Sequence, residues 1–451
     1  MRRTLSLIAS IVFAGSLMGT LWPDAPGNEH PNLSSLTHAA VERVSPDSAE
    51  WILYDRDPNH PWNRLYRALY RRESPDGKEY GYDELDPLLW AGTKDLVVEP
   101  GYGRTIGVLD EFLTSHSERA INDPLKRAIL QRDLWAVFDW TIRTGRESSQ
   151  TVNLQNKLFE IIRRLALRPE EISRLPDSYQ AAIKSRAFPA FYDPDKRTQA
   201  FLPPDLFDRA GPWVMLSARG GQPIAITHVS FFSGRSLFLI FMRLPGGRAA
   251  TLDYLKSLDS IRKPWLPDAN GPEGVMPNPQ VPEFPPGTEL ALVRKAMLID
   301  KEGKLQPSNI VEDIQLRVHR TIPAEILPMH NIDRDDARRA LDVFEFKFSR
   351  RQLFAGEGGL RAVQVGEEEF ALFASHDFEF ERRQPLVGCA SCHFRPGVHS
   401  MLSRGRLAGT ARVEVVPSWE LNYEPELTKS WKGRQYDWGL LQGLWRARAA
   451  N

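Results

Sequence analysis

The sequence predicts an α+β fold, with a helical N-terminal part, a strand-rich middle and a short, mainly helical C-terminal segment. Three observations lead to this class. Apolar residues recur at helical spacing through residues 51–185. Short apolar runs bounded by glycine and proline follow from residue 186. A helical pattern returns at Leu427–Arg446, with Trp431, Trp438, Leu441 and Trp445 expected on one face.

Local start signals mark the first helices. Asn59-His60-Pro61 precedes a stripe of apolar residues at helical spacing, with proline early, where its missing N–H does no harm. Asp123-Pro124 precedes a second helix, which Gly145 is expected to stop. A third apolar stripe runs from Leu154 to Leu165. All three stripes are expected to face the core.

The strands are expected in short runs bounded by turn residues. Ser233-Gly234 is expected to turn a hairpin between two of them, and the loop Asp300 to Gly303 to separate two longer ones. The expected strands are Trp213–Leu216, Ile224–Phe232, Leu237–Met242, Leu290–Ile299, Ile310–His319, Val343–Phe348 and Phe370–Phe373.

Changes of composition divide the chain into seven stretches. The stretch at 264–286 holds eight prolines and is expected to be a stiff connector without regular structure. The predicted stretches are a leader at 1–22, a tether at 23–50, a helical region at 51–185, a mixed α/β region at 186–263, the connector at 264–286, a strand-rich region at 287–375 and a C-terminal segment at 376–451.

The N-terminus is typical of an export signal. Met1-Arg2-Arg3 is a short positive region, and residues 4–22 are uncharged and largely apolar. The cleavage site is poor, so the leader is either a signal peptide or an uncleaved membrane anchor. We therefore expect the chain to be exported, to the periplasm or to the outer face of the cytoplasmic membrane.

Composition excludes some partners and sites. Lys+Arg and Asp+Glu both count 58, and there is no basic block, so nucleic acid is not expected as a partner. The sequence contains no phosphate-binding loop, no dinucleotide-binding glycine pattern and no zinc-protease or hydrolase motif.

The motif that carries chemistry lies near the C-terminus. The two cysteines of the chain fall in Cys389-Ala390-Ser391-Cys392-His393, the pattern of covalent haem attachment. Two residues between the thiols let both sulfurs reach the two vinyl groups at one porphyrin edge, and the next residue places an imidazole under the iron. This pattern arises by chance in roughly one chain in ten thousand of this length and composition.

Two other interpretations of the cysteine pair stay open. In an oxidising compartment the two thiols can form a disulfide, as a redox pair or a small structural link. A zinc site from Cys389, Cys392, His399 and a remote ligand is also conceivable, although no second ligand pair stands at finger spacing.

The segment resembles the haem site of c-type cytochromes. The resemblance implies one covalent haem c, with Cys389 and Cys392 as thioether anchors and His393 as the proximal iron ligand. It covers five residues, and residues 376–451 are accordingly predicted to be the haem-binding segment. The rest departs from a small cytochrome c, because only 58 residues follow His393 and Met401 is the single methionine among them.

Geometry ranks the candidates for the sixth iron ligand. A chain that rounds the porphyrin edge must travel ~25 Å, whereas six extended residues to His399 reach about 21 Å and eight to Met401 about 28 Å. The turn expected at Arg395-Pro396-Gly397 shortens both paths. His376 has more freedom, and strand alternation places it beside Phe378 and Phe380. His376 and Met401 are thus the distal candidates.

Other polar residues receive weaker assignments. His228, His319 and His330 are expected to be structural, although iron ligation by them stays open. Arg382, Arg383 and Arg395 flank the motif and are candidates for pairing with haem propionates, since a guanidinium matches a carboxylate.

The leading functional expectation is electron transfer through one haem, with a redox partner protein. One alternative is a haem enzyme, peroxidase-like or substrate-oxidising, in which the large body forms a pocket over an open distal site for a small-molecule substrate. The other is an exported protein without haem, in which the cysteine pair is structural or redox-active.

Overall fold

The computed structural model describes residues 53–73, 79–86, 96–143, 147–218, 221–261, 263, 265–267, 275–322, 340–370, 382–383, 385–386, 397–401, 415–417 and 423–449. The described helices fall mainly before residue 186 and after residue 422. They are α1 Pro61–Tyr70, α2 Gly101–Thr114, α3 Pro124–Arg143, α4 Ser149–Leu165, α5 Pro169–Ser173, α6 Ser178–Ser185, α7 Ile226–Phe231, α8 Gly247–Asp259, α10 Arg350–Phe354, α12 Tyr423–Lys432 and α13 Tyr436–Ala449, with 3-10 turns η2 Ser117–Arg119 and η4 Val398–Ser400.

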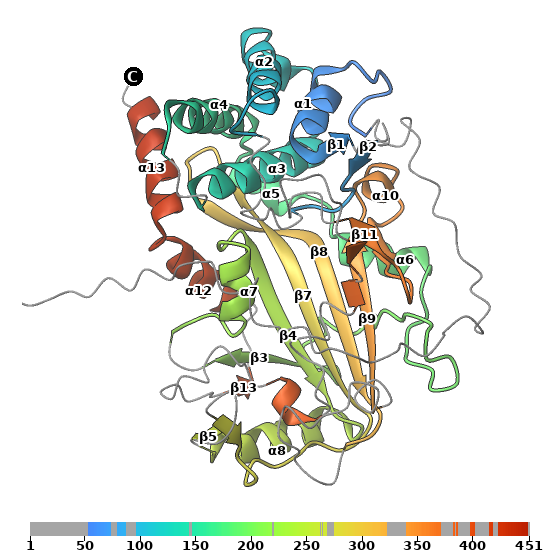
Figure 1. Ribbon diagram of the computed structural model, residues 1–451. Coiled ribbons are helices and arrows are strands. Elements are labelled where there is room, and N and C mark those ends of the chain that lie inside the picture. The colour runs from blue at the N-terminus through green and yellow to red at the C-terminus, as the bar shows by residue number, and fades with distance from the viewer. Residues whose placement is uncertain are drawn as a thin grey trace, which may run out of the picture. The chain divides into compact units, whose positions relative to one another are not determined.

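One antiparallel sheet forms the centre of the described residues, with the strand order β10-β9-β8-β7-β4-β3-β13 (Figure 1). Its strands are β3 Val214–Ala218, β4 Ser236–Arg243, β7 Thr288–Ile299, β8 Leu305–His319, β9 Leu341–Phe348, β10 Leu360–Ala362 and β13 Val415–Pro417. Three two-stranded pairs accompany it: β1 Arg71–Glu73 with β2 Glu79–Gly81, β5 Trp265–Pro267 with β6 Val275–Pro277, and β11 Glu369–Phe370 with β12 Arg382–Arg383. The predicted α+β class is confirmed.

The predicted helix starts are confirmed by their caps. The His60 side chain accepts a hydrogen bond from the Trp62 N–H at 3.3 Å, with Pro61 as the first residue of α1. Asp123 accepts from the Leu125 N–H at 2.8 Å at the start of α3. Helix α3 ends at Arg143, and Gly145, its predicted stop, lies outside the described residues.

Strands β7 and β8 form a long hairpin that α3 crosses at one end (Figure 1). The predicted turn at Asp300 to Gly303 connects them, with Asp300 Oδ1 accepting from the N–H groups of Glu302 and Lys304 at 2.9 Å each. Gln131 of α3 exchanges two hydrogen bonds with the backbone of Ile299, at 2.8 and 3.1 Å. These bonds fasten the helical layer to the end of the sheet.

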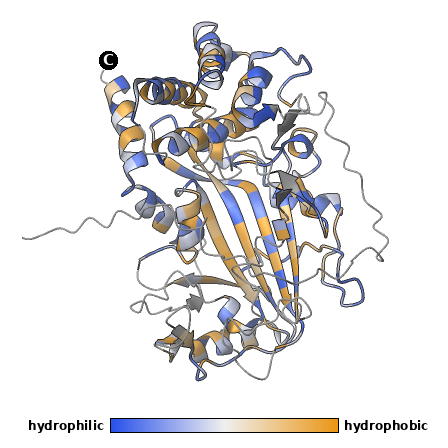
Figure 2. Cartoon of the chain, in the orientation of Figure 1, coloured by the Kyte–Doolittle hydropathy of each residue, from blue (hydrophilic) through white to orange (hydrophobic). Residues whose placement is uncertain are grey.

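Alternation along the strands divides the sheet into two buried faces. On one face, Leu239, Val293 and Leu316 join the large core that α1, α3 and α4 also enter. On the other face, Met242 and Leu290 join a smaller cluster with Leu255 of α8. Figure 2 shows hydrophilic segments interrupting the hydrophobic ones on the long strands. Helices thus cover a sheet that is polar in places.

Two predicted elements are wrong. The run Ile224–Phe232 was expected to be a strand, but Ile226–Phe231 is helix α7, whose buried Val229 packs against Phe238. A run this short carries no clear period, and packing against β4 decides its conformation. The expected hairpin turn, Ser233-Gly234, instead ends the helix: both residues have positive φ, and the Gly234 N–H donates to the Val229 carbonyl at 2.8 Å.

The proline-rich connector also differs from its prediction. Residues 265–267 pair with residues 275–277 as strands β5 and β6. Pro267 and Pro277 each end a strand, where the missing N–H is tolerated. Regular structure therefore survives among the prolines.

The C-terminal helix is confirmed as helical but is broken into α12 and α13 at residues 433–435. The break places Trp431 against a third cluster, formed by Ala225, Val229 and Phe238. Trp438, Leu441 and Trp445 instead pack on the large core. The expectation of a single tryptophan face is therefore wrong. The described part of the predicted strand Phe370–Phe373 is Phe370, which lies in β11.

Candidate functional site

The predicted haem ligands lie outside the described residues. This applies to Cys389, Cys392 and His393, and to the distal candidate His376. His330 and Arg395 also fall there, as do the side chains of Arg382 and Arg383. The nearest described segments are Pro385–Leu386 before the motif and Gly397–Met401 after it. The described geometry closest to the motif is therefore that of residues 397–401, which follow the motif and are called the leaving segment below.

Two side chains hold the backbone of this leaving segment. The Gly397 N–H donates to Nδ1 of His319, the last residue of β8, at 3.0 Å. The Val398 N–H donates to Oε1 of Glu283, which also accepts from the Phe284 N–H at 3.1 Å. Ser400 closes the turn, because its hydroxyl donates to the Gly397 carbonyl at 2.8 Å.

The side chains of the leaving segment are packed. Val398 is completely buried in the small cluster that contains Leu255 and Leu290, and Met401 packs against the same cluster. The His399 ring is buried beside Trp265, with ring centroids 5.0 Å apart. Met401, a predicted distal candidate, thus has apolar neighbours in this structure. Whether it binds iron stays a prediction.

His319 is a buried, neutral imidazole. Burial first, and the nearby Arg317 guanidinium second, lower its pKa to about 3. Because Nδ1 accepts a hydrogen bond from a backbone N–H, the ring proton resides on Nε2. Among the described residues, Nε2 is buried with no hydrogen-bond partner, and Phe284 packs edge-on against the ring with the ring centroids 4.8 Å apart. In this tautomer the proton on Nε2 occupies the position at which a metal would bind.

Glu283 is held in a similar environment. Burial raises its pKa to about 7, against the lowering effect of the hydrogen bonds from the Val398 and Phe284 N–H groups. Among the described residues no cation lowers the pKa of Glu283, in contrast to the carboxylates of this fold that pair with arginine or lysine. Its carboxyl group is engaged by backbone amides.

The same sheet face carries charged side chains farther along β7, β8 and β9. Burial first, and the neighbouring Asp313 carboxyl to which it is hydrogen-bonded second, raise the pKa of Glu345 to about 8. The pair therefore retains one shared proton near neutral pH. His228 of α7 lies near Arg317 and Arg294 and remains neutral, since burial first and the arginines second lower its pKa to about 4.

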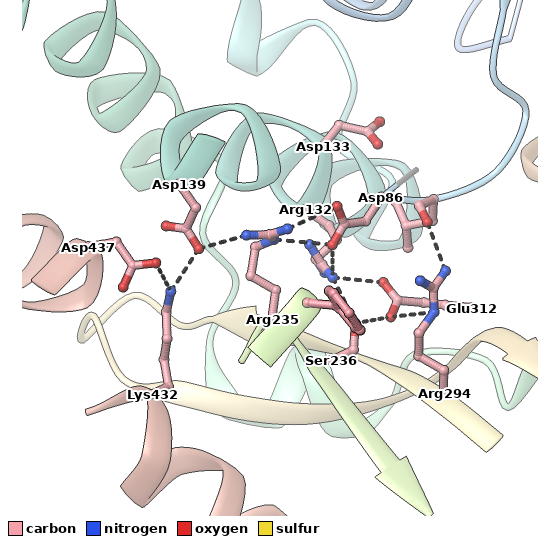
Figure 3. Close-up of polar contacts among 12 residues, drawn as sticks. Asp86, Arg132, Asp133, Asp139, Arg235, Ser236, Arg294, Glu312, Lys432 and Asp437 are labelled. Carbon is pink, nitrogen blue, oxygen red and sulfur yellow. Dashed lines mark hydrogen bonds and ion pairs between the residues drawn. The ribbon is translucent and has the colours of Figure 1, made fainter. Parts of the chain in front are cut away.

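A buried ion-pair row runs between the helical layer and the sheet (Figure 3). Its members alternate in sign, and consecutive members lie 2.6 to 3.5 Å apart. In order they are Asp437, Lys432, Asp139, Arg235, Asp86, Arg132, Glu312 and Arg294. Four carboxylates thus balance four cations.

In the ion-pair row, neighbouring cations oppose the effect of burial on the carboxyl pKa values. Burial alone would raise the pKa of Asp86, but the guanidinium groups of Arg132 and Arg235 outweigh it and hold that pKa at about 2. Burial raises the pKa of Asp139 despite the opposing effect of Lys432. Charges that are buried and paired in this way connect structural elements, so we assign the ion-pair row to the fold.

Neither the leaving segment nor the ion-pair row forms a metal centre among the described residues. Within the described ranges, no group of three or more His, Cys, Asp or Glu side chains is arranged to hold a metal ion. Among the same residues, no helix is both long enough and apolar enough to cross a bilayer. The predicted leader lies outside these residues.

Glu283 and the ion-pair row were missed by the sequence interpretation. Glu283 stands among prolines and carries no local signal. A hint of the ion-pair row in the sequence is that charged residues, such as Arg132 in α3 and Glu312 in β8, stand within elements that also carry many apolar residues, since buried charges need partners. The turn predicted at Arg395-Pro396-Gly397 has one described residue, Gly397, whose φ is +92°.

Comparison with known proteins adds no assignment. No protein-family model, no curated protein and no solved structure matches this chain.

Proposed function

We propose that this chain is an exported protein that carries one covalent haem c and transfers single electrons to a redox partner. The observation that carries the proposal is the motif Cys389 to Cys392 with His393, formed by the two cysteines of the entire chain. The donor set of two thiols and one imidazole fits haem c. The apolar leader supports export, and cytochrome c haem is attached after translocation.

The chain's own residues have defined tasks in this proposal. Cys389 and Cys392 anchor the porphyrin edge, and His393 binds the iron on the proximal side. The bound haem supplies a reversible one-electron couple. Gly397 and Val398, held by His319 and Glu283, restrain the backbone just beyond the proximal histidine.

Covalent attachment is tested first. The full chain is expressed with a cytochrome c maturation system, denatured, and stained for haem after electrophoresis. We expect one haem per chain, with the pyridine haemochrome spectrum of two thioether bonds. Cys392→Ala should remove the stain or shift that spectrum to one thioether bond, whereas His399→Ala, six residues beyond His393 and outside the motif, should retain it. An unstained wild-type chain contradicts the proposal and favours a structural or redox cysteine pair.

A haem enzyme with an open distal site is the second candidate, and two observations favour it. Met401 packs against an apolar cluster, and Nε2 of His319 carries the ring proton, so neither described side chain is arranged as a sixth ligand. Carbon monoxide added to the reduced protein separates the two functions. Rapid binding supports the enzyme, whereas a six-coordinate, unreactive iron supports electron transfer.

A further inference from the structure

The segment that leaves the motif is held from two distant parts of the chain. His319 lies 78 residues before Gly397, and Glu283 lies 115 residues before Val398. The two acceptors grip consecutive amides, so the backbone is restrained in both position and direction. Both acceptor side chains come from around the hairpin strands: Glu283 precedes β7, and His319 ends β8.

The conformation of Gly397 and its lack of a side chain allow these two hydrogen bonds to form. Its φ of +92° lies in the region that favours glycine. A Cβ atom there would collide with the carboxylate of Glu283. The close approach of the carboxylate to the Gly397 backbone therefore requires that no side chain stand at this position.

Packing reinforces the grip. Val398 is completely buried in the cluster with Leu255 and Leu290, so its amide cannot leave Glu283 without exposing an apolar side chain. Phe284, next to Glu283, packs edge-on against the His319 ring. The neighbour of one acceptor thus supports the ring of the other.

The grip lies close to the iron ligand along the chain. Gly397 is the fourth residue after His393, and four residues span at most about 14 Å when fully extended. A restraint on Gly397 therefore limits where the proximal histidine can stand.

We propose that Glu283 and His319 form a clip that holds the C-terminal end of the haem-attachment segment and so limits where the proximal histidine can lie. The inference rests on the proposed function, because it concerns the same haem. Glu283 and His319 are positioning residues in this scheme: they touch the backbone of the segment and act on the iron through it.

Hydrogen exchange tests the grip independently of haem. In the full chain, the Gly397 amide should exchange at least tenfold faster in His319→Leu, and the Val398 amide at least tenfold faster in Glu283→Ala, since each change removes one buried acceptor. Glu283→Gln keeps an acceptor oxygen and should restore most of the Val398 protection. Glu302→Ala, at an exposed glutamate, is the matched control and should change neither amide.

Two glycine-to-alanine substitutions distinguish a collision with Glu283 from the backbone strain of a positive φ. Gly397→Ala adds a methyl group that meets Glu283, whereas Gly366→Ala adds one at a similar φ of +78° with nothing within 4 Å. We expect Gly397→Ala alone to release both amides. Equal effects of the two substitutions, or protection unchanged in Glu283→Ala and His319→Leu, would overturn the grip.

A second experiment tests the effect on the haem and uses the protein with covalently attached haem. Electron paramagnetic resonance of the oxidised wild type should show one set of g values, and Glu283→Ala should broaden it or add a second set and shift the reduction potential. Glu283→Gln should return both toward wild type. Unchanged spectra and potential in a variant that has lost amide protection would overturn the positioning role. A chain that takes up no haem refutes the proposed function and this role together, while amide exchange still decides whether the grip exists.

Discussion

Replacing Lys432 by methionine should lower the free energy of unfolding, because it removes one cation from the buried ion-pair row. The Lys432 side chain is completely buried, and its Nζ lies 2.7 Å from Asp139 and 2.9 Å from Asp437. Methionine nearly preserves the volume of the aliphatic stem, so the loss is electrostatic. It leaves two buried carboxylates with one cation fewer (Figure 3).

The expected magnitude follows from that deficit. Removal of one partner from a buried ion pair costs about 3–5 kcal/mol, because the remaining charge stays out of water. Asp139 keeps Arg235 at 3.0 Å, which limits the loss, so we expect about 3 kcal/mol. Lys429→Met, in the same helix, is the matched control. Lys429 pairs with an exposed glutamate, and its loss should cost about 0.5 kcal/mol.

The assay is urea unfolding of both variants at pH 8 and pH 5. Burial already raises the folded pKa of Asp139, and loss of Lys432 raises it further. An acid with a raised folded pKa contributes stability that is present at low pH and lost as pH rises through that pKa. The deficit of Lys432→Met should therefore be larger at pH 8 than at pH 5. A deficit within 1 kcal/mol of the Lys429→Met control (about a fivefold change in the unfolding equilibrium), or one that does not change with pH, would refute the reasoning.

Three further predictions concern other buried positions. Gly303→Ala adds a methyl group 2.9 Å from the Trp445 ring at φ +77°, and should lower the free energy of unfolding by about 2 kcal/mol more than Gly356→Ala, which has a similar φ and open space. Equal losses would contradict the packing argument. Burial raises the folded pKa of Glu424 to about 7, so its favourable contribution is lost as pH rises through 7; Glu424→Gln should therefore gain stability over the wild type in urea unfolding as pH increases from 5 to 8. No pH-dependent gain would count against it. Arg350→Met removes the cation that pairs twice with Asp133, at 2.8 and 3.0 Å, and should lower the free energy of unfolding by about 3 kcal/mol; a loss near zero would be the contrary outcome.

Local chemistry explains the parts of the fold that could be predicted. His60, Asp123 and Asp300 act on backbone groups two to four residues away, so the signal and its partner stand together in the sequence. The run at Ile224–Phe232 lacked such a signal. Its conformation depends on packing against Phe238 in the following strand β4, and the prediction was wrong there.

The candidate site divides in the same way. The haem motif is contiguous and could be recognised from five residues, and it stays a prediction because these residues lie outside the described ones. The clip joins Glu283 and His319 to amides 115 and 78 residues away. Neither residue has a neighbour in the sequence that reveals its partner, so no pattern could have indicated the clip.

The ion-pair row also constrains the order of events during biosynthesis. Lys432 and Asp437 stand after the haem motif, whereas the other six members precede it. In a chain made from its N-terminus, Cys389 and Cys392 are therefore synthesised before Lys432, the partner that completes the pairing of Asp139. We expect the ion-pair row, and with it the contact between the helical layer and the sheet, to close only after both cysteines have been made.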